Sequence, residues 1–527
     1  MLVNIAQLAK EIMRIFSALK ISSCILIDTS KQRLKPGDKL AMSEDILRLE
    51  PQEVWKYFYS LTKVPRPSGH EEKVRSFIAD FGKNLGLETT VDDIGNIVIR
   101  KPAVTGLESR EGVVLQAHLD MVPQKNGNTD HDFEHDPIEA VIDGDWVRAD
   151  GTTLGADNGI GVAAAMAVLA STTLVHGPIE ALFTCEEETG MTGAFGLKAG
   201  QLRGGILMNL DSEDEGELFI GCAGGLEVTV ILDYDKRPVP EGHAGFMIGV
   251  SGLKGGHSGM DIHLGRGNAN KIMNRLLYYG HERHGLKLAS IEGGTLRNAI
   301  PRESKATVVV PAEQSRCFLD ELAMFSQIVQ RELAVVDSGL RVITVPVETP
   351  EYIIENSVVS RFLHMFYALP DGVMRMSDEV PGLVETSNNL AVVASCDGAL
   401  KVECLLRSSV DSARDDLGIM IRSVARLAGA EPVLSGSYPG WKPDPESTIL
   451  KSMRDVYKAK FGKAPEIKAV HAGLECGIIG STYPGLDMIS FGPTIRYPHS
   501  PDEKVHIASV GKFWNFLVEA LRNVPEV

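Results

Sequence analysis

The segment between residues 95 and 213 alternates apolar strands with helices, and its strands end in carboxylates or an imidazole. Residues 111–120, 179–188 and 204–213 read as strands that finish in His-Leu-Asp, Glu-Glu-Glu and Leu-Asp-Ser-Glu. Residues 157–170, rich in small apolar side chains, predict a helix between the first two strands. This alternation indicates a largely parallel sheet, whose ligands bind at the carboxyl ends of the strands.

The middle of the chain has a different pattern. Long apolar strands, a helix and a hairpin with an Asp-Gly turn at 397–398 favour a separate α+β domain at residues 225–437. The α/β pattern returns after it, with two more helices. The sequence therefore predicts the α/β class: residues 42–224 and 438–527 form a domain with a mainly parallel sheet sandwiched by helices, and residues 225–437 interrupt it.

Composition argues against several classes of protein. The 527 residues carry a net charge of −17 and no long run of Lys and Arg, so no nucleic-acid partner is expected, because phosphate binding requires a clustered basic face. The seven cysteines are odd in number and include no Cys-x-x-Cys pair, which argues against a disulfide framework and a cysteine-ligated zinc. This cysteine usage fits a reducing compartment, and we expect a cytoplasmic protein.

Residues 1–41 form an N-terminal extension whose status the sequence leaves open. Its apolar residues have helical spacing, but Lys10, Glu11 and Arg14 interrupt them. No stretch approaches the roughly 18 apolar residues of a membrane span, so no membrane partner is expected. The extension also lacks the positive charge followed by an unbroken apolar run that is typical of a secretory signal. A simpler alternative is that the protein starts at Met42.

His118 and Asp120 end the strand 111–120. Side chains two apart on a strand share a face, so His118 could bind a metal ion while Asp120 orients its imidazole. A structural histidine with satisfied hydrogen bonds is the commoner explanation of this pattern taken alone. Both interpretations remain open at this point.

Two acidic groups follow along the chain. Asp157, ahead of the small-residue helix, has the usual position of an N-cap, but its two oxygens could also bridge two cations. Glu186, Glu187 and Glu188 could form a solvated acidic loop. Because successive residues of a strand point opposite ways, these carboxylates could instead divide metal binding and general-base catalysis between them.

Asp211 and His499 are ordinary residues when each is considered alone. Together with His118, Asp157 and Glu188 they form a set of imidazoles and carboxylates without thiolates. Such a set suits zinc, manganese or cobalt.

A series of motifs, in order along the chain, is similar to a known family. They are HLDMVPQ, GTTLGADNGIG, EEETGMTGAFGL, NLDSEDEGE, GCAGG, KGGHSG, GGTLRNAIPRE, HAGLECG and GPT…PHSPDEKVHI. The sequence resembles the aminoacyl-histidine dipeptidases, also called peptidase D or cytosol non-specific dipeptidases, in the di-zinc family of carboxypeptidase G and aminoacylase. The resemblance runs from about Met42 to the C-terminus and does not include residues 1–41.

The resemblance implies hydrolysis of dipeptides, either Xaa-His or a broader range, with two Zn²⁺ per subunit that Co²⁺ or Mn²⁺ can replace. It assigns His118 and Asp211 to one zinc, Glu188 and His499 to the other, and Asp157 to both. Asp120 would support His118. Glu187 would be the general base, a choice that rests on the Glu-Glu-x-Gly spacing of the family.

The resemblance also implies substrate-binding roles for His257, Asn298 and Arg407, and for the backbone of Gly473. Alone, Arg407 reads as a surface charge and Gly-Gly-His-Ser-Gly as a turn. The α/β domain would be catalytic. The inserted residues 225–437 would form a lid and the dimerisation domain of a homodimer, in which the lid histidine can come from the other subunit.

Two alternatives remain from the sequence. One is the same machinery acting on another amide, as a carboxypeptidase, tripeptidase or N-acyl amino acid deacylase. The length of the lid and the GGTLRNAIPRE and HAGLECG motifs favour a dipeptidase. The other is a non-catalytic binding protein with this fold, which the intact Glu187 and the full ligand set disfavour. A phosphate-binding enzyme is not supported, because no GxxxxGK[ST] motif occurs.

Overall fold

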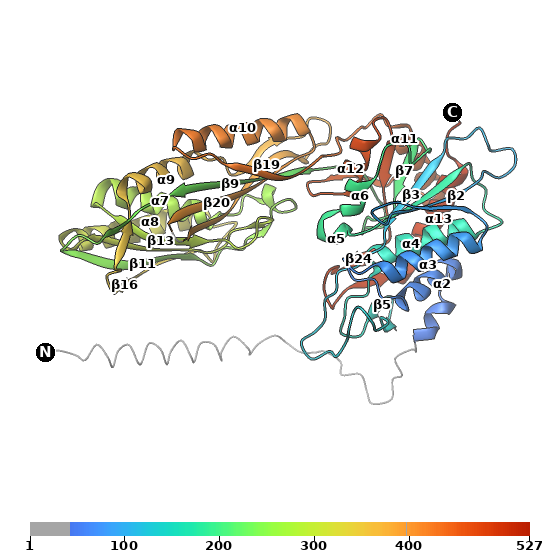
Figure 1. The fold of residues 1–527 in the computed structure, drawn as a ribbon, viewed down its shortest axis with the longest axis horizontal. Coiled ribbons are helices and arrows are strands. Elements are labelled where there is room, and N and C mark those ends of the chain that lie inside the picture. Colours follow the sequence, from blue (N-terminus) through green and yellow to red (C-terminus); the bar gives the residue numbers. More distant parts are fainter. Residues whose placement is uncertain (1–42, 397, 527) are drawn as a thin grey trace. The chain divides into compact units, whose positions relative to one another are not determined.

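A large mixed sheet carries the strands that end in the candidate site residues. The computed structural model describes residues 43–396 and 398–526. The strand order of this eight-stranded sheet is β1-β2-β6-β3-β7-β23-β8-β22; Figure 1 labels β2, β3 and β7. In that order the strands are Glu88–Val91, Ile97–Lys101, Ile179–Thr184, Val113–His118, Ile206–Asn209, Asp487–Ser490, Glu217–Cys222 and Glu466–Val470.

The centre of this sheet is parallel. β3 pairs in parallel with β6 and with β7, and β7 pairs in parallel with β23. β1, β2 and β6 pair antiparallel at one side. Because the four central strands run the same way, their carboxyl ends meet at one edge, as the sequence predicted.

Helices cover both faces of the sheet, since side chains of each strand alternate between two apolar clusters. Val113, Leu115 and Ala117 pack in one cluster, and Val114 packs in the other. The first cluster contains residues of α2 (Gln52–Thr62), α3 (Glu72–Asn84), α4 (Ala156–Ala170), α11 (Thr448–Phe461) and α13 (Ile507–Arg522). The second contains residues of α6 (Thr192–Gly196) and α12 (Glu475–Thr482). The predicted sandwich is confirmed.

A second, antiparallel sheet lies within the middle of the chain. Its order is β16-β11-β15-β13-β19-β20-β9-β21, with β18 paired to β19. The strands are β9 (Gly224–Asp233), β11 (His243–Ser251), β13 (Lys287–Gly293), β15 (Ser304–Pro311), β16 (Arg341–Val347), β18 (Gly372–Met376), β19 (Val384–Cys396), β20 (Ala399–Ser408) and β21 (Val433–Tyr438). Its core includes α7 (Ala269–His284), α8 (Ser315–Glu332), α9 (Asn356–Ala368) and α10 (Asp411–Leu427) (Figure 1).

This second sheet begins at Gly224 and ends at Tyr438. The predicted α+β character of the inserted region is therefore confirmed. The hairpin predicted there is formed by β19 and β20, which pair antiparallel, and Asp397 of its turn is outside the described residues. The domain boundaries after residues 224 and 437 stay predictions.

Smaller elements complete the described part of the chain. β24, β25, β5 and β4 form a four-stranded sheet in that order, while β10 pairs with β17 and β12 pairs with β14. Their bounds are β4 (Ala140–Asp143), β5 (Trp146–Ala149), β10 (Lys236–Pro238), β12 (Gly256–His257), β14 (Ala299–Ile300), β17 (Tyr352–Ile354), β24 (Ile495–Arg496) and β25 (Lys504–His506). The short helices are η1 (Ser43–Arg48), α5 (Glu187–Gly190), η2 (Ile262–Leu264) and η3 (Ala312–Gln314).

The predictions made for residues 1–41 lie outside the described residues. Within the described ones, no helix is both long and apolar enough to cross a membrane.

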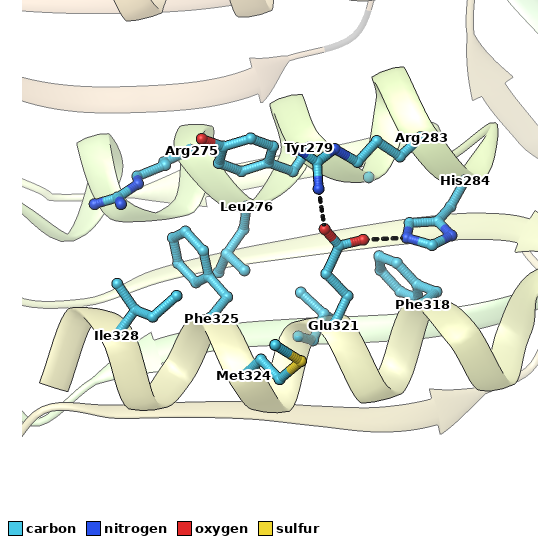
Figure 2. A pocket seen from close by; sticks show the side chains of 12 residues that line it. Arg275, Leu276, Tyr279, Arg283, His284, Phe318, Glu321, Met324, Phe325 and Ile328 are labelled. Atoms are coloured by element: carbon cyan, nitrogen blue, oxygen red, sulfur yellow. Dashed lines mark hydrogen bonds and ion pairs between the residues drawn. The ribbon is translucent and has the colours of Figure 1, made fainter.

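A pocket of about 260 Å³ opens between α7 and α8 in the inserted region (Figure 2). Glu321 of α8 reaches across it to His284 and, at 2.6 Å, to Nη1 of Arg283. The pocket contains none of the predicted site residues. Its acidic group is already paired, so it is not the candidate site.

Candidate metal centre

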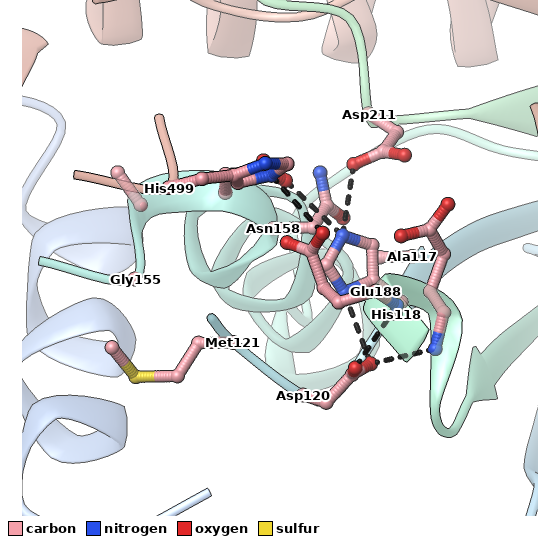
Figure 3. Close-up of polar contacts among 12 residues, drawn as sticks. Ala117, His118, Asp120, Met121, Gly155, Asn158, Glu188, Asp211 and His499 are labelled. Atoms are coloured by element: carbon pink, nitrogen blue, oxygen red, sulfur yellow. Dashed lines mark hydrogen bonds and ion pairs between the residues drawn. The ribbon is translucent and has the colours of Figure 1, made fainter. Parts of the chain in front are cut away.

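The five predicted metal ligands come from distant parts of the chain and meet at the carboxyl edge of the large sheet. His118 is the last residue of β3, and Asp211 lies two residues beyond β7. Asp157 lies in the first turn of α4, and Glu188 lies in α5. His499 lies in the loop between β24 and β25 (Figure 3). The structure therefore brings all five side chains together.

Asp157 occupies the middle of this group. Its Oδ1 is 3.1 Å from Nε2 of His118, and its Oδ2 is 3.1 Å from Nε2 of His499. Gly155, not Asp157, is the N-cap residue of α4. The N-cap alternative for Asp157 is therefore wrong, and its two oxygens face different imidazoles.

The other two carboxylates each approach one histidine. Glu188 Oε2 is 3.0 Å from Nε2 of His499, and Asp211 Oδ1 is 3.3 Å from Nε2 of His118. The contacts thus divide the group into two halves that share Asp157. The sequence resemblance implied the same pairs, His118 with Asp211 and His499 with Glu188. The roles of these residues as metal ligands stay predictions.

The donor set fits a divalent cation. His118, Asp157 and Glu188 each contribute one ligand atom, and these three atoms lie within 4.8 Å of one another. Glu188 Oε1 is buried without a hydrogen-bond partner. Buried polar atoms normally have partners, because an unpartnered one loses the hydration it had in water. A cation among these oxygens would supply the missing interaction.

Burial and the neighbouring charges shift the pKa values of the proposed ligands. Burial lowers the pKa of His118, but Asp211, Asp120 and Asp157 together raise it well above its ordinary value. Hydrogen bonds with Asp157 and Glu188 raise the pKa of His499 to about 11. Burial raises the pKa of Glu188 and of Asp211. A metal ion that binds to these groups would therefore compete with protons.

Asp120 lies beneath His118 and connects it to the acidic loop. Its Oδ1 is 3.3 Å from Nδ1 of His118 and accepts a hydrogen bond from the backbone N–H of Glu187 at 3.0 Å. Its Oδ2 accepts from Ser68 Oγ and from the backbone N–H of Glu188. Burial opposes the ionised form, but these hydrogen bonds, first that with His118, hold the pKa of Asp120 at about 2.

The acidic run does not continue the strand as the sequence analysis assumed. β6 ends at Thr184, Glu186 has the left-handed φ of 50°, and Glu187 and Glu188 begin the helical turn α5. Hydrogen bonds from both backbone N–H groups to Asp120 hold this turn. The strand alternation invoked for these residues is therefore wrong. Burial raises the pKa of Glu187 well above its ordinary value.

Two of the four predicted substrate-binding residues, Arg407 and Gly473, lie near Tyr438, which sequence analysis missed. Arg407 is 5% exposed, and it donates to Ser258 Oγ at 3.2 Å and to the Tyr438 hydroxyl at 3.1 Å. A Cβ on Gly473 would lie 3.1 Å from the Tyr438 ring. His257 precedes Ser258. Arg407 is therefore buried, and the prediction that it reads as a surface charge when considered alone is wrong.

Two of the predicted substrate-binding residues, His257 and Asn298, lie at a short pair of strands. β12, which contains His257, pairs with β14, and Asn298 directly precedes β14. Asn298 is exposed, and its carbonyl accepts from the backbone N–H of Ser258. Nδ1 of His257 accepts from the backbone N–H groups of Gly259 and Met260, so the proton of the neutral ring lies on Nε2.

A row of buried polar side chains crosses the sheet below the strand ends, and sequence analysis missed it. Glu475 of α12 accepts hydrogen bonds from Gln116 Nε2 at 2.6 Å and Thr184 Oγ1 at 2.8 Å. Asn209 donates to Gln116, and Ser490 donates to Asn209. Burial raises the pKa of Glu475 to about 7. The available signal was a polar residue in or at the end of each apolar strand.

These features define a class before any comparison is made. An α/β sandwich with an imidazole and carboxylates at the ends of its parallel strands has the architecture of a metal-dependent α/β enzyme. The chain belongs to peptidase family M20/M25/M40, whose family model matches residues 114–523.

Individual relatives agree with the family assignment. A protein of Escherichia coli (strain K12) named cytosol non-specific dipeptidase is 48% identical over 484 residues, which cover 92% of this chain and all of the relative. The crystal structure of aminoacylhistidine dipeptidase from Vibrio alginolyticus is also 48% identical, covers 92% of this chain and 98% of its own, and has a TM-score of 0.87. Aminopeptidase PepT from Bacillus cereus ATCC 10987, at 15% identity, covers 90% of this chain and 99% of its own with a TM-score of 0.53, and shows only the fold.

Proposed function

We propose that the protein is a metal-dependent dipeptidase that hydrolyses Xaa-His or a broader range of dipeptides. The observation that carries the proposal is the position of Asp157, whose two oxygens each meet a different imidazole. The relatives named dipeptidases in Escherichia coli and Vibrio alginolyticus support the choice of substrate.

Two divalent cations, zinc in this proposal and replaceable by cobalt or manganese, would bind the five-residue group. His118 and Asp211 would hold one, Glu188 and His499 would hold the other, and Asp157 would serve both. Cations bound there would lower the pKa of a water from 15.7 toward about 7 and polarise the peptide carbonyl.

Glu187 would be the general base. It would accept a proton from the attacking water and return it to the nitrogen of the leaving amino acid. Burial raises the pKa of this carboxyl, which strengthens it as a proton acceptor. Asp120 contacts both the backbone of Glu187 and the ring of His118, so it would hold these two residues in fixed positions.

Arg407 would bind the free carboxylate of the dipeptide. Its guanidinium is buried, and the side chains to which it donates hydrogen bonds, those of Ser258 and Tyr438, are both neutral. Among the described residues, no carboxylate forms an ion pair with it. A buried charge without a counter-ion is unfavourable, so this group is suited to an anionic ligand. Gly473 would present its backbone to the same substrate.

His257 would donate a hydrogen bond from its Nε2–H to the carbonyl oxygen as negative charge develops there. Burial, followed by the charge of Arg407, lowers the pKa of His257, so the ring is a neutral donor. Asn298, beside it on the strand pair, would contribute a further polar contact to the substrate. None of the hydrogen bonds or ion pairs described for His257 reaches the five-residue group.

We therefore infer a homodimer in which the inserted region completes the site of the other subunit. β16 is an edge strand with exposed Ile343, Val345 and Val347, and α8 exposes Met324 and Ile328. An exposed apolar edge strand is a template for pairing with a second chain.

The cytoplasm is the proposed compartment, because the described cysteines are free thiols and none forms a disulfide.

The test is a substrate panel assayed with defined metals. Chelated protein should lose activity, and zinc, cobalt or manganese should restore it. Dipeptides should be cleaved, with Xaa-His compared against other second residues. Preferential cleavage of tripeptides or N-acyl amino acids would change the substrate class. Full activity in protein shown by elemental analysis to be metal-free would overturn the proposal.

A further inference from the structure

The loop that carries His499 is attached to the start of α4 by a second residue, Glu503. The Glu503 side chain is 2% exposed, and its carboxylate accepts four backbone hydrogen bonds. Oε2 accepts from Leu154 at 2.7 Å and Gly155 at 2.9 Å. Oε1 accepts from Ala156 at 2.8 Å and Asp157 at 3.2 Å.

The four donors are consecutive N–H groups that precede the regular part of α4, because Asp157 and Asn158 do not have helical backbone angles. Hydrogen bonds from N–H groups to a carboxylate are strong when the carboxylate is ionised. The Glu503 side chain therefore holds the backbone of Asp157, while His499 in the same loop contacts the Asp157 side chain at 3.1 Å. Two separate contacts fix this loop against one residue.

Arg66 makes the corresponding connection to the segment of His118. Its guanidinium is 3% exposed and donates through Nη1 to the carbonyls of Leu119 and Asp120, both at 2.9 Å. Its Nη2 donates to the carbonyl of Gly155. Leu119 and Asp120 directly follow His118.

Gly155 is where the two connections meet. Its N–H donates to Glu503 and its carbonyl accepts from Arg66. It has a φ of 70°, and a Cβ there would lie 2.6 Å from Arg66 Nη2 and 2.8 Å from Met121 Sδ, so only glycine fits (Figure 3). Arg66 and Glu503 therefore bind the backbone of the same residue.

We propose that Arg66 and Glu503 are positioning residues that fix the spacing of His118, Asp157 and His499 before a cation binds, and so set the affinity for divalent metal. This Arg66–Glu503 brace has no direct contact with a cation or substrate in the proposal. The inference rests on the proposed function only in treating the five-residue group as a metal site. It does not depend on which amide is hydrolysed.

The brace has a specific physical consequence. Ligands held at the correct spacing pay less conformational entropy on binding than ligands that a cation must first gather. Replacement of a residue that orients metal ligands typically weakens metal affinity about 10- to 100-fold. A residue that only stabilised the fold would lower thermal stability and leave the affinity of the folded protein unchanged.

The experiment measures Zn²⁺ affinity of the metal-free, full-length protein by competition with a chromophoric chelator. Glu503→Gln keeps the size of the side chain but replaces one accepting oxygen with a donor. Its Zn²⁺ affinity should fall about 10- to 100-fold. Asp502→Asn is the matched control, because Asp502 is the exposed neighbour in the same loop and its affinity should not change.

Arg66→Lys tests the other half of the brace and replaces Glu503→Gln if that variant does not fold. Lysine keeps the charge but not the fork that reaches three carbonyls, so affinity should also fall. Glu503→Asp, which keeps the carboxylate, should lose less than Glu503→Gln. Unchanged Zn²⁺ affinity in folded brace variants would overturn the proposal, even if their melting temperatures fell.

The result also separates this inference from the proposed function. Unaltered protein that binds two Zn²⁺ tightly, loses affinity in the variants and cleaves no dipeptide would support the brace and remove the dipeptidase proposal. Active, metal-dependent protein with unchanged affinity in the variants would remove only the brace. Unaltered protein that binds no Zn²⁺ would overturn both.

Discussion

Nε2 of His499 lies 3.1 Å from Oδ2 of Asp157, although 342 positions separate the two residues in the sequence. The contact joins the last part of the chain to the start of α4. The second oxygen of Asp157 meets His118 at the same distance. Asp157 is therefore the residue on which both halves of the candidate metal centre depend.

Substitution of Asp157 tests this dependence. Asp157→Asn keeps the shape of the side chain but replaces one oxygen with an amide nitrogen that does not bind metal. Metal content should fall from two ions per chain to one or none, measured by elemental analysis after dialysis. Asp132→Asn, in an exposed loop, should keep both ions. Two tightly bound ions in Asp157→Asn would contradict a shared ligand.

Glu187 and Glu188 should have separable effects, because only Glu188 contacts a histidine of the centre. Glu187→Gln loses the proton acceptor, so kcat should fall by about a hundredfold or more while both metals remain. Glu188→Gln should instead weaken metal binding. The measurement pairs initial rates at saturating dipeptide with metal content of the same samples. If Glu187→Gln lost metal and Glu188→Gln kept it, the two roles would be exchanged.

Metal binding should release protons. Hydrogen bonds with Asp157 and Glu188 raise the pKa of His499 to about 11, so this imidazole is protonated near neutral pH in metal-free protein. A cation binds only the neutral ring, and binding should therefore release about one proton from His499. Calorimetric titration with Zn²⁺ in buffers of different ionisation enthalpy measures the number. His499→Ala should release fewer protons than the unaltered protein.

The pH dependence of stability and of Zn²⁺ affinity follows from the same raised pKa of His499. The folded-state pKa of His499 lies above the value of about 6.5 expected in the unfolded chain. Its contribution to the stability of metal-free protein is therefore complete below that value and is lost as pH rises toward 11. Zn²⁺ affinity should rise over the same range, because protons compete less well. Affinity that did not change with pH would contradict protonation of the ligands.

Arg407 should select substrates with a free carboxylate. Loss of a charge-assisted hydrogen bond costs about 1.5–3 kcal/mol, or roughly 10- to 150-fold in kcat/KM. We expect Arg407→Ala to lose at least that much on dipeptides, measured from initial rates. Arg422→Ala, a change at an arginine paired with Glu431, should retain normal kcat/KM.

Amidated dipeptides provide the control for this clamp. They should be poor substrates of the unaltered protein and should lose less from Arg407→Ala, because the guanidinium has no charge to hold. Equal hydrolysis of free and amidated dipeptides by the unaltered protein would count against a carboxylate clamp.

Local patterns predicted much of the fold because they depend on short-range physics. The apolar segment that forms β3 and the small-residue segment that forms α4 were recognised from periodicity. The acidic run was not, because the turn at Glu187 and Glu188 is held by Asp120, which lies just beyond another strand. Arg66 and Glu503 were missed for the same reason, because their hydrogen-bond partners are distant in the sequence. Glu503 and Asp157, for example, are 346 positions apart.

The sequence by itself determined the α/β class, the inserted α+β region and the residue types of a metal centre, because alternation, helical spacing and ordered motifs are properties of the chain. Only the tertiary structure decided that the two oxygens of Asp157 face different histidines and that Arg407 is buried beside Tyr438. Those relationships join residues that lie between 31 and 342 positions apart in the sequence. They exist only when the sheet and the packed helices place the segments together, because hydrogen bonding and burial depend on distance in space.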